Sequence, residues 1–231
     1  MNILGLKKGY FIAIEGIDAS GKTSQVALLK QALQLIGFTV EDYRSPGTTG
    51  LGEKIRKIVK SNDINMASEA ELCLMCADRI QLVKEKIIPA LEKGHIVICD
   101  RYHLSTLVYQ GNGRMLNKDI VKAFAQFSVL DTVPDLTFVM NVSEEEAAKR
   151  ISKRGTTDRF EQEDKDYQAR IRQGFDWLIS MESKSNGKLL AIDANRPIED
   201  IHNEIYRCTA YRIGQLKEGQ LVNDTDKKIL I

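Results

Sequence analysis

The chain has 231 residues, a length that suits one α/β domain with a sizeable core and leaves little room for a second domain. Its 33 basic residues nearly balance 32 acidic ones, so no overall field draws it to nucleic acid or to an anionic membrane. No apolar run approaches the ~18 residues of a membrane span, and no signal-peptide pattern opens the sequence. We therefore predict a soluble cytoplasmic protein, or one of the host cytoplasm if a virus encodes it.

Four cysteines are too few for a disulfide scaffold in a chain of this length. Cys73 and Cys76 have C-x-x-C spacing, but they lie inside an apolar helical pattern, with no second pair or nearby histidine. We predict no zinc or redox role for them.

A glycine-rich segment joins the first predicted strand, residues 10–14, to a predicted helix over residues 24–36. Residues 16–23 read GIDASGKT and fit the G-x-x-x-x-G-K-[ST] phosphate loop without a mismatch. A glycine turn that matches by chance is the alternative, and the flanking strand and helix argue against it. The motif predicts nucleoside triphosphate binding.

Each residue type in this loop has a physical reason. Gly16 and Gly21 let the backbone turn so that successive N–H groups and the helix N-terminus point at a phosphate chain. We expect Lys22 to reach the β- and γ-phosphates and the Thr23 hydroxyl to ligate Mg²⁺. The loop does not identify the group that receives the phosphate.

A second strand is predicted over residues 40–44, and the turn-forming residues 45–50 end it sharply. In an α/β sheet such a break delivers the carboxyl end of a strand to the ligand crevice. The basic helix predicted over residues 51–60 is explained by a solvated face.

A long helix is predicted from Ser68, which forms a capping box with Glu71, to about residue 91. Pro89 falls in its last turns and predicts a kink or an earlier end.

Residues 96–99 form the least ambiguous buried strand, and Asp100, Arg101 and Tyr102 follow it. An aspartate that closes such a strand beside a phosphate loop is suited to the Mg²⁺ shell, and Arg101 is suited to grip a phosphate. A helix cap and a surface ion pair remain the alternative. A helical element over residues 105–111 and a turn at residues 112–113 come next.

The second half alternates in the same way. Helices are predicted over residues 119–130, 167–181 and 197–212, and strands over residues 136–142 and 189–193. Ser143 and Glu146 form a second capping box, which opens a helix toward residue 153. The only tryptophan, Trp177, is expected in the core.

Residues 149–161 hold five basic side chains and almost nothing apolar. A solvated face accounts for them, but after a strand of a phosphate-loop domain they also predict a lid that closes arginines over a triphosphate.

Strands alternating with helices predict the α/β class, with a three-layer, doubly wound fold of the P-loop NTPase type. We expect about five parallel strands with helices on both faces. One domain over residues 1–212 would carry the lid at about residues 150–162, and a loosely attached tail would follow over residues 213–231.

Four segments, in order, resemble the thymidylate kinase family, P-loop enzymes that convert dTMP and ATP into dTDP and ADP. They are residues 11–25; residues 44–48 with 51–53; Asp100-Arg101-Tyr102 through Ser105 to Tyr109-Gln110-Gly111; and residues 158–161, which read DRFE. The third segment is specific to the family, whereas the phosphate loop is generic. The resemblance spans about residues 8–210.

The resemblance implies a site for ATP, a site for Mg²⁺ and a site for the acceptor, dTMP. The implied ATP-binding residues are Gly16, Ile17, Asp18, Ala19, Ser20, Gly21, Lys22, Thr23, Ser24 and Arg150. The implied Mg²⁺ ligands are Thr23 and Asp100. The implied acceptor-binding residues are Asp18, Arg44, Pro46, Met75, Arg79, Arg101, Ser105, Tyr109 and Gln110. The implied catalytic set is Lys22, Asp18, Arg101 and Arg154.

Within the acceptor site, the resemblance assigns the sugar 3′-hydroxyl to Asp18 and the phosphate to Arg44 and Arg101. The resemblance also implies that Arg79 and Ser105 face the pyrimidine. Tyr109, supported by Gln110, would exclude a ribose 2′-hydroxyl. At the ATP site, Arg150 would pack on the adenine. Arg154 would approach the phosphates from the lid.

The sequence departs from the family at three positions. Ala19 replaces a loop arginine of some relatives, so the lid must supply the transition-state arginine. Ser45 replaces the usual glutamate between arginine and proline. Met75 stands where a phenylalanine stacks on thymine, so dUMP or a 5-modified deoxyuridylate is a further candidate acceptor.

Two other functions stay open. A deoxynucleoside kinase would have an acceptor without phosphate, and the arginines Arg44 and Arg101 favour an anionic acceptor instead. A nucleotide-binding regulatory module would keep the loop without turnover. The family also implies a homodimer formed through a helix face, and the stripe of Leu72, Leu82 and Val83 suits either that interface or an internal core.

Overall fold

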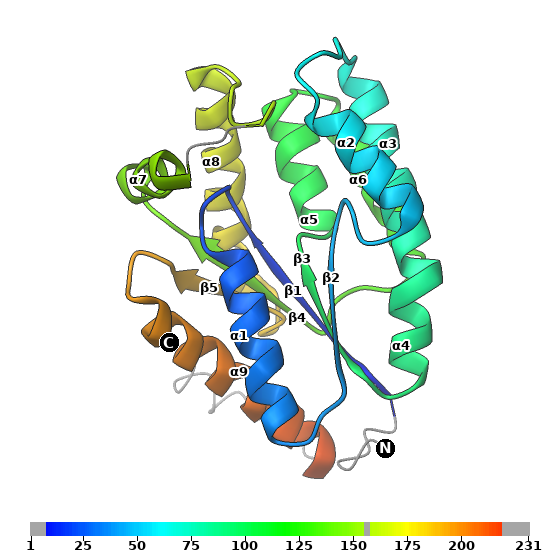
Figure 1. Cartoon of the computed structure of the whole chain (residues 1–231), viewed down its shortest axis with the longest axis vertical. Helices are drawn as coiled ribbons and strands as arrows, with labels where there is room; N and C mark the ends of the chain where they lie inside the picture. The colour runs from blue at the N-terminus through cyan, green and yellow to red at the C-terminus, as the bar shows by residue number, and fades with distance from the viewer. Residues whose placement is uncertain (1–7, 155–157, 219–231) are drawn as a thin grey trace.

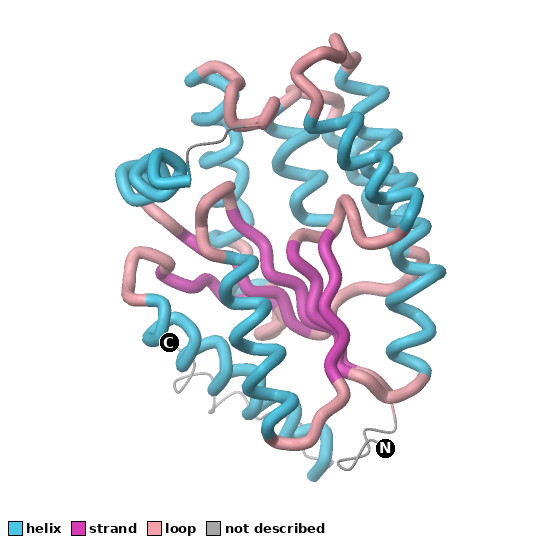
Figure 2. Tube along the Cα trace, in the orientation of Figure 1, coloured by secondary structure: helices cyan, strands magenta, loops and turns pink. Residues whose placement is uncertain are grey.

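The computed structural model describes residues 8–154 and 158–218. Its five strands are β1 (Tyr10–Gly16), β2 (Val40–Arg44), β3 (Ile96–Asp100), β4 (Leu136–Asn141) and β5 (Leu189–Asp193). They form one sheet in the order β2-β3-β1-β4-β5, and every neighbouring pair is parallel (Figures 1 and 2). The predicted strand number and direction are therefore confirmed.

Helices cover both faces of the sheet. They are α1 (Lys22–Leu35), α2 (Gly50–Lys60), α3 (Ser68–Leu82), α4 (Ile88–Glu92), α5 (His103–Thr106), α6 (Lys118–Val129), α7 (Glu144–Arg154), α8 (Lys165–Ser180) and α9 (Ile198–Glu218). Two π-helical segments, η1 (Val83–Ile87) and η2 (Leu107–Gly113), and a 3₁₀ turn, η3 (Glu182–Lys184), complete the described chain. None of the described helices is both long and apolar enough to cross a bilayer.

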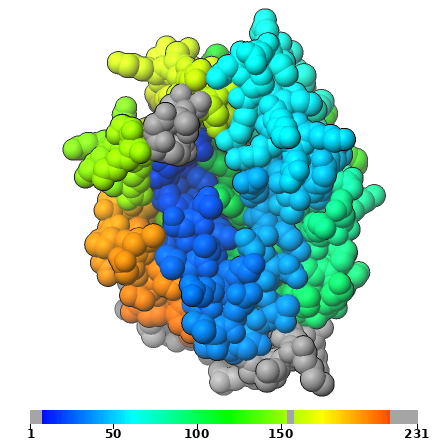
Figure 3. Space-filling model, in the orientation of Figure 1, coloured from blue at the N-terminus to red at the C-terminus, as the bar shows by residue number. Residues whose placement is uncertain are grey.

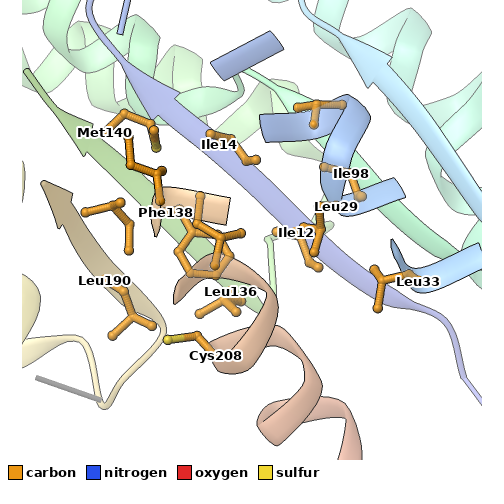
Figure 4. Packing of buried hydrophobic residues seen from close by; sticks show 14 of the residues in the cluster. Ile12, Ile14, Leu29, Leu33, Ile98, Leu136, Phe138, Met140, Leu190 and Cys208 are labelled. Atoms are coloured by element: carbon orange, nitrogen blue, oxygen red, sulfur yellow. The ribbon is translucent and has the colours of Figure 1, made fainter. Parts of the chain in front are cut away.

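The alternation of side chains along β1 divides the core into two layers. Ile12 and Ile14 pack on the face covered by α1 and α9, where Figure 4 shows them beside Leu29 and Phe138. Phe11 and its alternating partner Ala13 face the opposite layer, against η1, α4 and Tyr102. Because β1 is the central strand, both of its faces are buried and its sequence is almost continuously apolar.

The long predicted helix is present and begins at Ser68, as predicted, but its N-terminal cap differs from the prediction. Ser68 is the first helical residue and Ala67 is the N-cap, without a side-chain cap, so the first predicted capping box is wrong. Glu71 is instead completely buried and bonded to other elements. The helix widens into η1 just before Pro89, a position where the missing proline N–H breaks the regular hydrogen-bond ladder.

Three predictions from the later chain need correction. Asn112 and Gly113 lie inside η2 rather than in a turn; a Cβ on Gly113 would lie 2.6 Å from Ile171 Cδ1, so this glycine permits close packing against α8. Trp177 is 47% exposed because the buried stripe of α8 runs along another side of the helix. Ser143 does cap α7, with its Oγ 3.3 Å from Glu146 N, but the Glu146 carboxylate pairs with Arg150 instead of completing the box.

The last helix extends beyond the predicted end. α9 continues to Glu218, and Ile213 is buried in the core, so the boundary drawn at residue 212 falls inside a helix. Residues 219–231 of the predicted tail lie outside the described residues.

Candidate active site

A cleft of about 420 Å³ lies at the carboxyl edge of the sheet, over the ends of β1, β2 and β3. Figure 3 shows this side of the molecule, with the blue amino-terminal segment between the cyan segment and the green α7. The sequence-predicted residues that line the cleft are Asp18, Ala19, Gly21, Lys22, Thr23, Ser24, Arg44, Pro46, Met75, Arg79, Asp100, Arg101, Ser105, Tyr109, Gln110 and Arg150. Gly16, Ile17 and Ser20 belong to the same loop without lining this cleft.

The loop after β1 has the backbone that a phosphate cradle needs. Gly16, Ala19 and Gly21 all have positive φ, at 145°, 59° and 93°. A Cβ on Gly16 would lie 2.8 Å from the Met140 carbonyl oxygen, so only glycine fits there. Gly21 is the N-cap of α1, and no side chain of the described residues caps the helix, so its first N–H groups can bind an anion.

Lys22 is buried and already held in the loop. Its Nζ donates to the Ile17 carbonyl at 2.7 Å and lies 3.4 Å from Ser20 Oγ. Burial and the nearby Arg101 guanidinium lower the pKa of Lys22 to about 8. The negative charge of a bound phosphate chain would favour the protonated amine and so raise the pKa of Lys22.

Thr23 and Asp100 meet at the mouth of the loop. The Thr23 hydroxyl donates to Asp100 Oδ2 at 2.7 Å, although the two residues are 77 positions apart. A hydroxyl and one carboxylate are hard oxygen ligands that suit Mg²⁺, which commonly takes its remaining ligands from water and substrate phosphates. Among the described residues no cluster of three acidic, histidine or cysteine side chains offers a metal site of its own.

Asp18, Arg101 and Tyr109 form one charged cluster at the centre of the cleft. Arg101 NH2 lies 2.6 Å from Asp18 Oδ1, its NH1 donates to the Gly16 carbonyl at 2.8 Å, and its guanidinium lies 4.9 Å from the Tyr109 ring centre. The Tyr109 hydroxyl donates to Asp18 Oδ2 at 3.2 Å. Although burial favours the neutral acid, Arg101 and Lys22 hold the pKa of Asp18 well below its usual range.

Glu15 of β1 supports this cluster by holding the segment that follows Arg101. The sequence interpretation missed this residue. The side chain is completely buried, and it accepts hydrogen bonds from Tyr102 N at 2.9 Å, from Ser105 N at 3.2 Å and from Ser105 Oγ at 2.5 Å. Arg101, between these elements, has a φ of 66°, a conformation that the Glu15 bonds help to hold. A carboxylate inside an apolar strand is the signal that could have found it.

Two further arginines line the far end of the cleft. Arg44 ends β2, and its side chain has no hydrogen-bond or ion-pair partner in the part of the chain that is described. Arg56 of α2 donates to the Pro46 carbonyl at 2.9 Å and also lines the cleft. Burial and the neighbouring Arg44 lower the pKa of Arg56. The sequence interpretation missed Arg56 because helical periodicity placed it on a solvated face. Together, the side chains of Arg44 and Arg56 form a pair of cations that suits an anionic ligand.

Asp78 shapes the loop that joins Arg44, at the end of β2, to α2, the helix that carries Arg56. Its carboxylate accepts from Ser45 Oγ at 2.7 Å and from Gly47 N at 3.1 Å, and burial raises its pKa. Ser45, one of the departures from the family, is therefore part of a buried hydrogen bond.

Arg79, Met75 and Gln110 line an inner part of the cleft. Arg79 is buried and donates to Ser128 Oγ at 3.0 Å, to Thr106 Oγ1 at 2.7 Å and to the Tyr102 carbonyl at 3.1 Å, while its Nε has no partner in the described structure. Met75 presents an apolar, partly buried surface to the same space. This part of the cleft combines an apolar wall with N–H donors, as a planar base requires.

The segments of the predicted lid are only partly described. Arg150 lies over the phosphate loop, with NH1 3.3 Å from the Ala19 carbonyl and NH2 2.9 Å from the Ala194 carbonyl. The side chain of Arg154 and residues 155–157 lie outside the described residues. Beyond them, Asp158 pairs with Lys60, and Phe160 is 7% exposed and lines the cleft.

The chain is similar to known thymidylate kinases in sequence and in fold. Residues 14–205 match the sequence profile of the family described as thymidylate kinase. The thymidylate kinase of Halothermothrix orenii is 40% identical over 202 residues, which cover 86% of this chain and 95% of that protein. That of Legionella pneumophila is 37% identical over 199 residues, or 85% and 92% of the two chains. A crystal structure of thymidylate kinase from Ehrlichia chaffeensis superposes with a TM-score of 0.70 at 28% identity, covering 87% of this chain and 99% of that one.

Proposed function

Because the chain belongs to the thymidylate kinase family, whose activity is the phosphorylation of dTMP by ATP, we propose that its cleft binds the two nucleotides end to end. The γ-phosphate of ATP would lie at the loop of residues 16–23, and the phosphate of dTMP would lie between that loop and the arginines at the end of β2. The observation that carries this proposal is the position of Arg101, which contacts Gly16 and Asp18 within the same cleft that Arg44 lines.

The acceptor phosphate needs no general base, since its oxygens are already ionised at neutral pH. One of these oxygens forms a bond to the γ-phosphorus of ATP while the bond to the β–γ bridging oxygen breaks, which gives dTDP and ADP. The role of the protein is to align the two groups and to neutralise their charge. Lys22 would contact the β- and γ-phosphates, and Arg101 with Arg44 and Arg56 would hold the acceptor.

Thr23 and Asp100 would hold Mg²⁺, whose charge would offset the negative charge on the triphosphate oxygens. Their 2.7 Å contact already brings a hydroxyl and a carboxylate to the mouth of the loop. Arg150 would cover the loop from above, and we propose Arg154 as the lid arginine at the transferring phosphoryl group.

Asp18 would act on the sugar. Its carboxylate is ionised, so it can accept a hydrogen bond from a 3′-hydroxyl. Tyr109 packs edge-on against Phe160, with ring centres 5.9 Å apart, which fixes the ring where a ribose 2′-hydroxyl would need space. The pocket therefore favours a deoxynucleotide.

The base would lie between Met75 and Arg79. Methionine gives an apolar, polarisable surface without the stacking energy of an aromatic ring, about 1 kcal/mol. We propose that dUMP is accepted along with dTMP. The apolar surface of Met75 can contact any pyrimidine ring, and it discriminates little between bases with and without a 5-methyl group.

We also infer a homodimer, through a different face from the stripe considered in the sequence. Leu72, Leu82 and Val83 are all buried inside the chain, so they are core residues. On α6, Ile120, Phe124 and Phe127 follow i, i+4, i+7 spacing and are 54%, 38% and 68% exposed. A second copy, as the family resemblance implies, would cover this stripe.

The experiment that tests the function is ADP release from ATP with dTMP, dUMP, dCMP, dGMP, dAMP and thymidine as acceptors, each with Mg²⁺. We expect turnover with dTMP, slower turnover with dUMP and none with purine nucleotides. A preference for thymidine over dTMP would replace the proposal with a nucleoside kinase. ATP binding without transfer to any acceptor would replace it with a regulatory module.

A further inference from the structure

Glu71 is a completely buried carboxylate outside the phosphate site, and none of the roles proposed above uses it. Its side chain is 1% exposed, although it lies in the first turn of α3. The carboxylate accepts from Gln110 Nε2 at 2.8 Å and from Arg114 Nε at 3.1 Å, and it forms an ion pair with Arg159. Two segments distant in sequence, residues 110–114 and the segment of Arg159, therefore meet at this carboxylate of α3.

The charges of this cluster cancel. Arg114 also pairs with Glu163 at 2.5 Å, so two guanidinium groups face two carboxylates. A buried ion pair of this kind contributes little net stability compared with apolar packing, because both partners lose their hydration. What it does provide is a fixed geometry, since each partner left alone would be an uncompensated buried charge.

Two arms of the cluster, one through Gln110 and one through Arg159, lead to the acceptor end of the cleft. Gln110 lines the cleft directly. Arg159 is bonded to the Val59 carbonyl at 2.9 Å, and its guanidinium lies 4.8 Å from the ring centre of Phe160. Phe160 in turn packs on Tyr109, whose hydroxyl donates to Asp18. No arm reaches Lys22, Thr23 or Arg150 at the donor end.

We propose that Glu71 is a positioning residue for the acceptor nucleotide. Its carboxylate holds Gln110 in the pocket and, through Arg159, holds Phe160 against Tyr109, so that the sugar subsite is formed before dTMP binds. Pre-organisation of this kind lowers the cost of binding without a direct contact to the ligand. The inference rests on the proposed function, because it names the site of dTMP as the one affected.

The test is the Glu71→Gln variant, which removes the charge and keeps the shape. We expect KM for dTMP to rise about tenfold, while KM for ATP and kcat each change by less than about threefold. The exclusion of a 2′-hydroxyl should also weaken, measured as the ratio of kcat/KM for dUMP to that for UMP.

Two controls separate positioning from general destabilisation. Glu182→Gln removes another glutamate charge, one that accepts from Ala191 N at 3.1 Å away from the cleft. Ile205→Ala opens the core on the opposite face of the sheet. Both should lower Tm without changing KM for dTMP. If Glu71→Gln changed only Tm, as these variants do, the carboxylate would be structural and the proposal wrong.

A second pair of variants tests the route through Arg159. Arg159→Met should raise KM for dTMP. Adding it to Glu71→Gln should raise KM little further, because both substitutions break the same Glu71–Arg159 ion pair. Fully multiplicative effects would overturn this route. If Glu71→Gln does not fold, Glu71→Asp withdraws the carboxylate by one methylene while keeping its charge, and the same rise in KM is expected.

Failure of the inference is distinct from failure of the function. A wild-type protein without dTMP kinase activity contradicts the proposed function. An active wild type whose Glu71 variants keep the wild-type KM for dTMP contradicts only the positioning role.

Discussion

Arg101 NH2 and Asp18 Oδ1 lie 2.6 Å apart, although one residue follows β3 and the other follows β1. The parallel pairing of these strands, in which Ile14 lies opposite Asp100, brings the two loops to the same edge of the sheet. Arg101 thus stands between the phosphate loop and the acceptor end of the cleft. An ion pair in this place keeps both groups charged and ready to exchange partners when phosphates enter.

Lys22 gives a prediction for pH dependence. Its pKa of about 8 in the free protein means that the amine is protonated at neutral pH and loses its proton as pH rises through 8. Since kcat/KM reports the free enzyme, kcat/KM for ATP should fall above about pH 8, whereas kcat should hold to higher pH because bound phosphates favour the charged amine. Lys22→Arg keeps its charge, so the alkaline limb of any remaining activity should disappear. A limb that persists in this variant belongs to another group.

Met75→Phe should tighten dTMP binding about fivefold, which corresponds to roughly 1 kcal/mol of stacking on the base. Isothermal titration with dTMP measures this directly, and kcat should change little. Met115→Phe is the matched control, because Met115 is 70% exposed and does not line the cleft. Weaker dTMP binding by Met75→Phe would show that the base lies elsewhere.

Arg56→Gln should raise KM for dTMP about tenfold or more, the typical effect of losing a charged hydrogen bond to phosphate. KM for ATP should stay near its wild-type value. Lys57→Gln removes the next positive charge on α2, which is exposed and outside the cleft, and should leave both constants unchanged. Equal effects of the two substitutions would mean that only the general field of α2 matters.

Phe127→Asp should convert a dimer into a monomer, because it places a charge in the most exposed part of the α6 stripe. Light scattering coupled to gel filtration gives the mass. Trp177→Asp is the control, since this exposed aromatic lies on α8 and outside the stripe. A wild-type protein that is monomeric at all concentrations would contradict the inferred dimer.

The sequence predicted the parts of the fold that depend on local pattern. Short β-branched runs gave the strands to within two residues, and the phosphate loop gave Lys22 and Thr23 because its chemistry is contiguous in sequence. Arg44 and Arg101 were predicted together because the carboxyl ends of parallel strands share an edge.

Residues whose role depends on tertiary contacts were missed. In the sequence, Arg56 is one of several basic residues on an amphipathic helix. Its side chain lines the cleft only because α2 packs beside the loop that follows β2. Glu71 fits a capping pattern, and nothing nearby in sequence reveals that Arg114 and Arg159 compete for its carboxylate. Trp177 was placed in the core because of its type, whereas the phase of α8 decides its exposure.

The most direct test of the central claim follows the phosphate itself. ATP labelled in its γ-phosphate is incubated with dTMP and Mg²⁺, and the products are separated by anion-exchange chromatography. We predict that the label appears in dTDP in amounts equal to the ADP formed, and that Lys22→Ala slows the transfer about a thousandfold. Label released only as inorganic phosphate, or transferred at the wild-type rate by Lys22→Ala, would contradict the account.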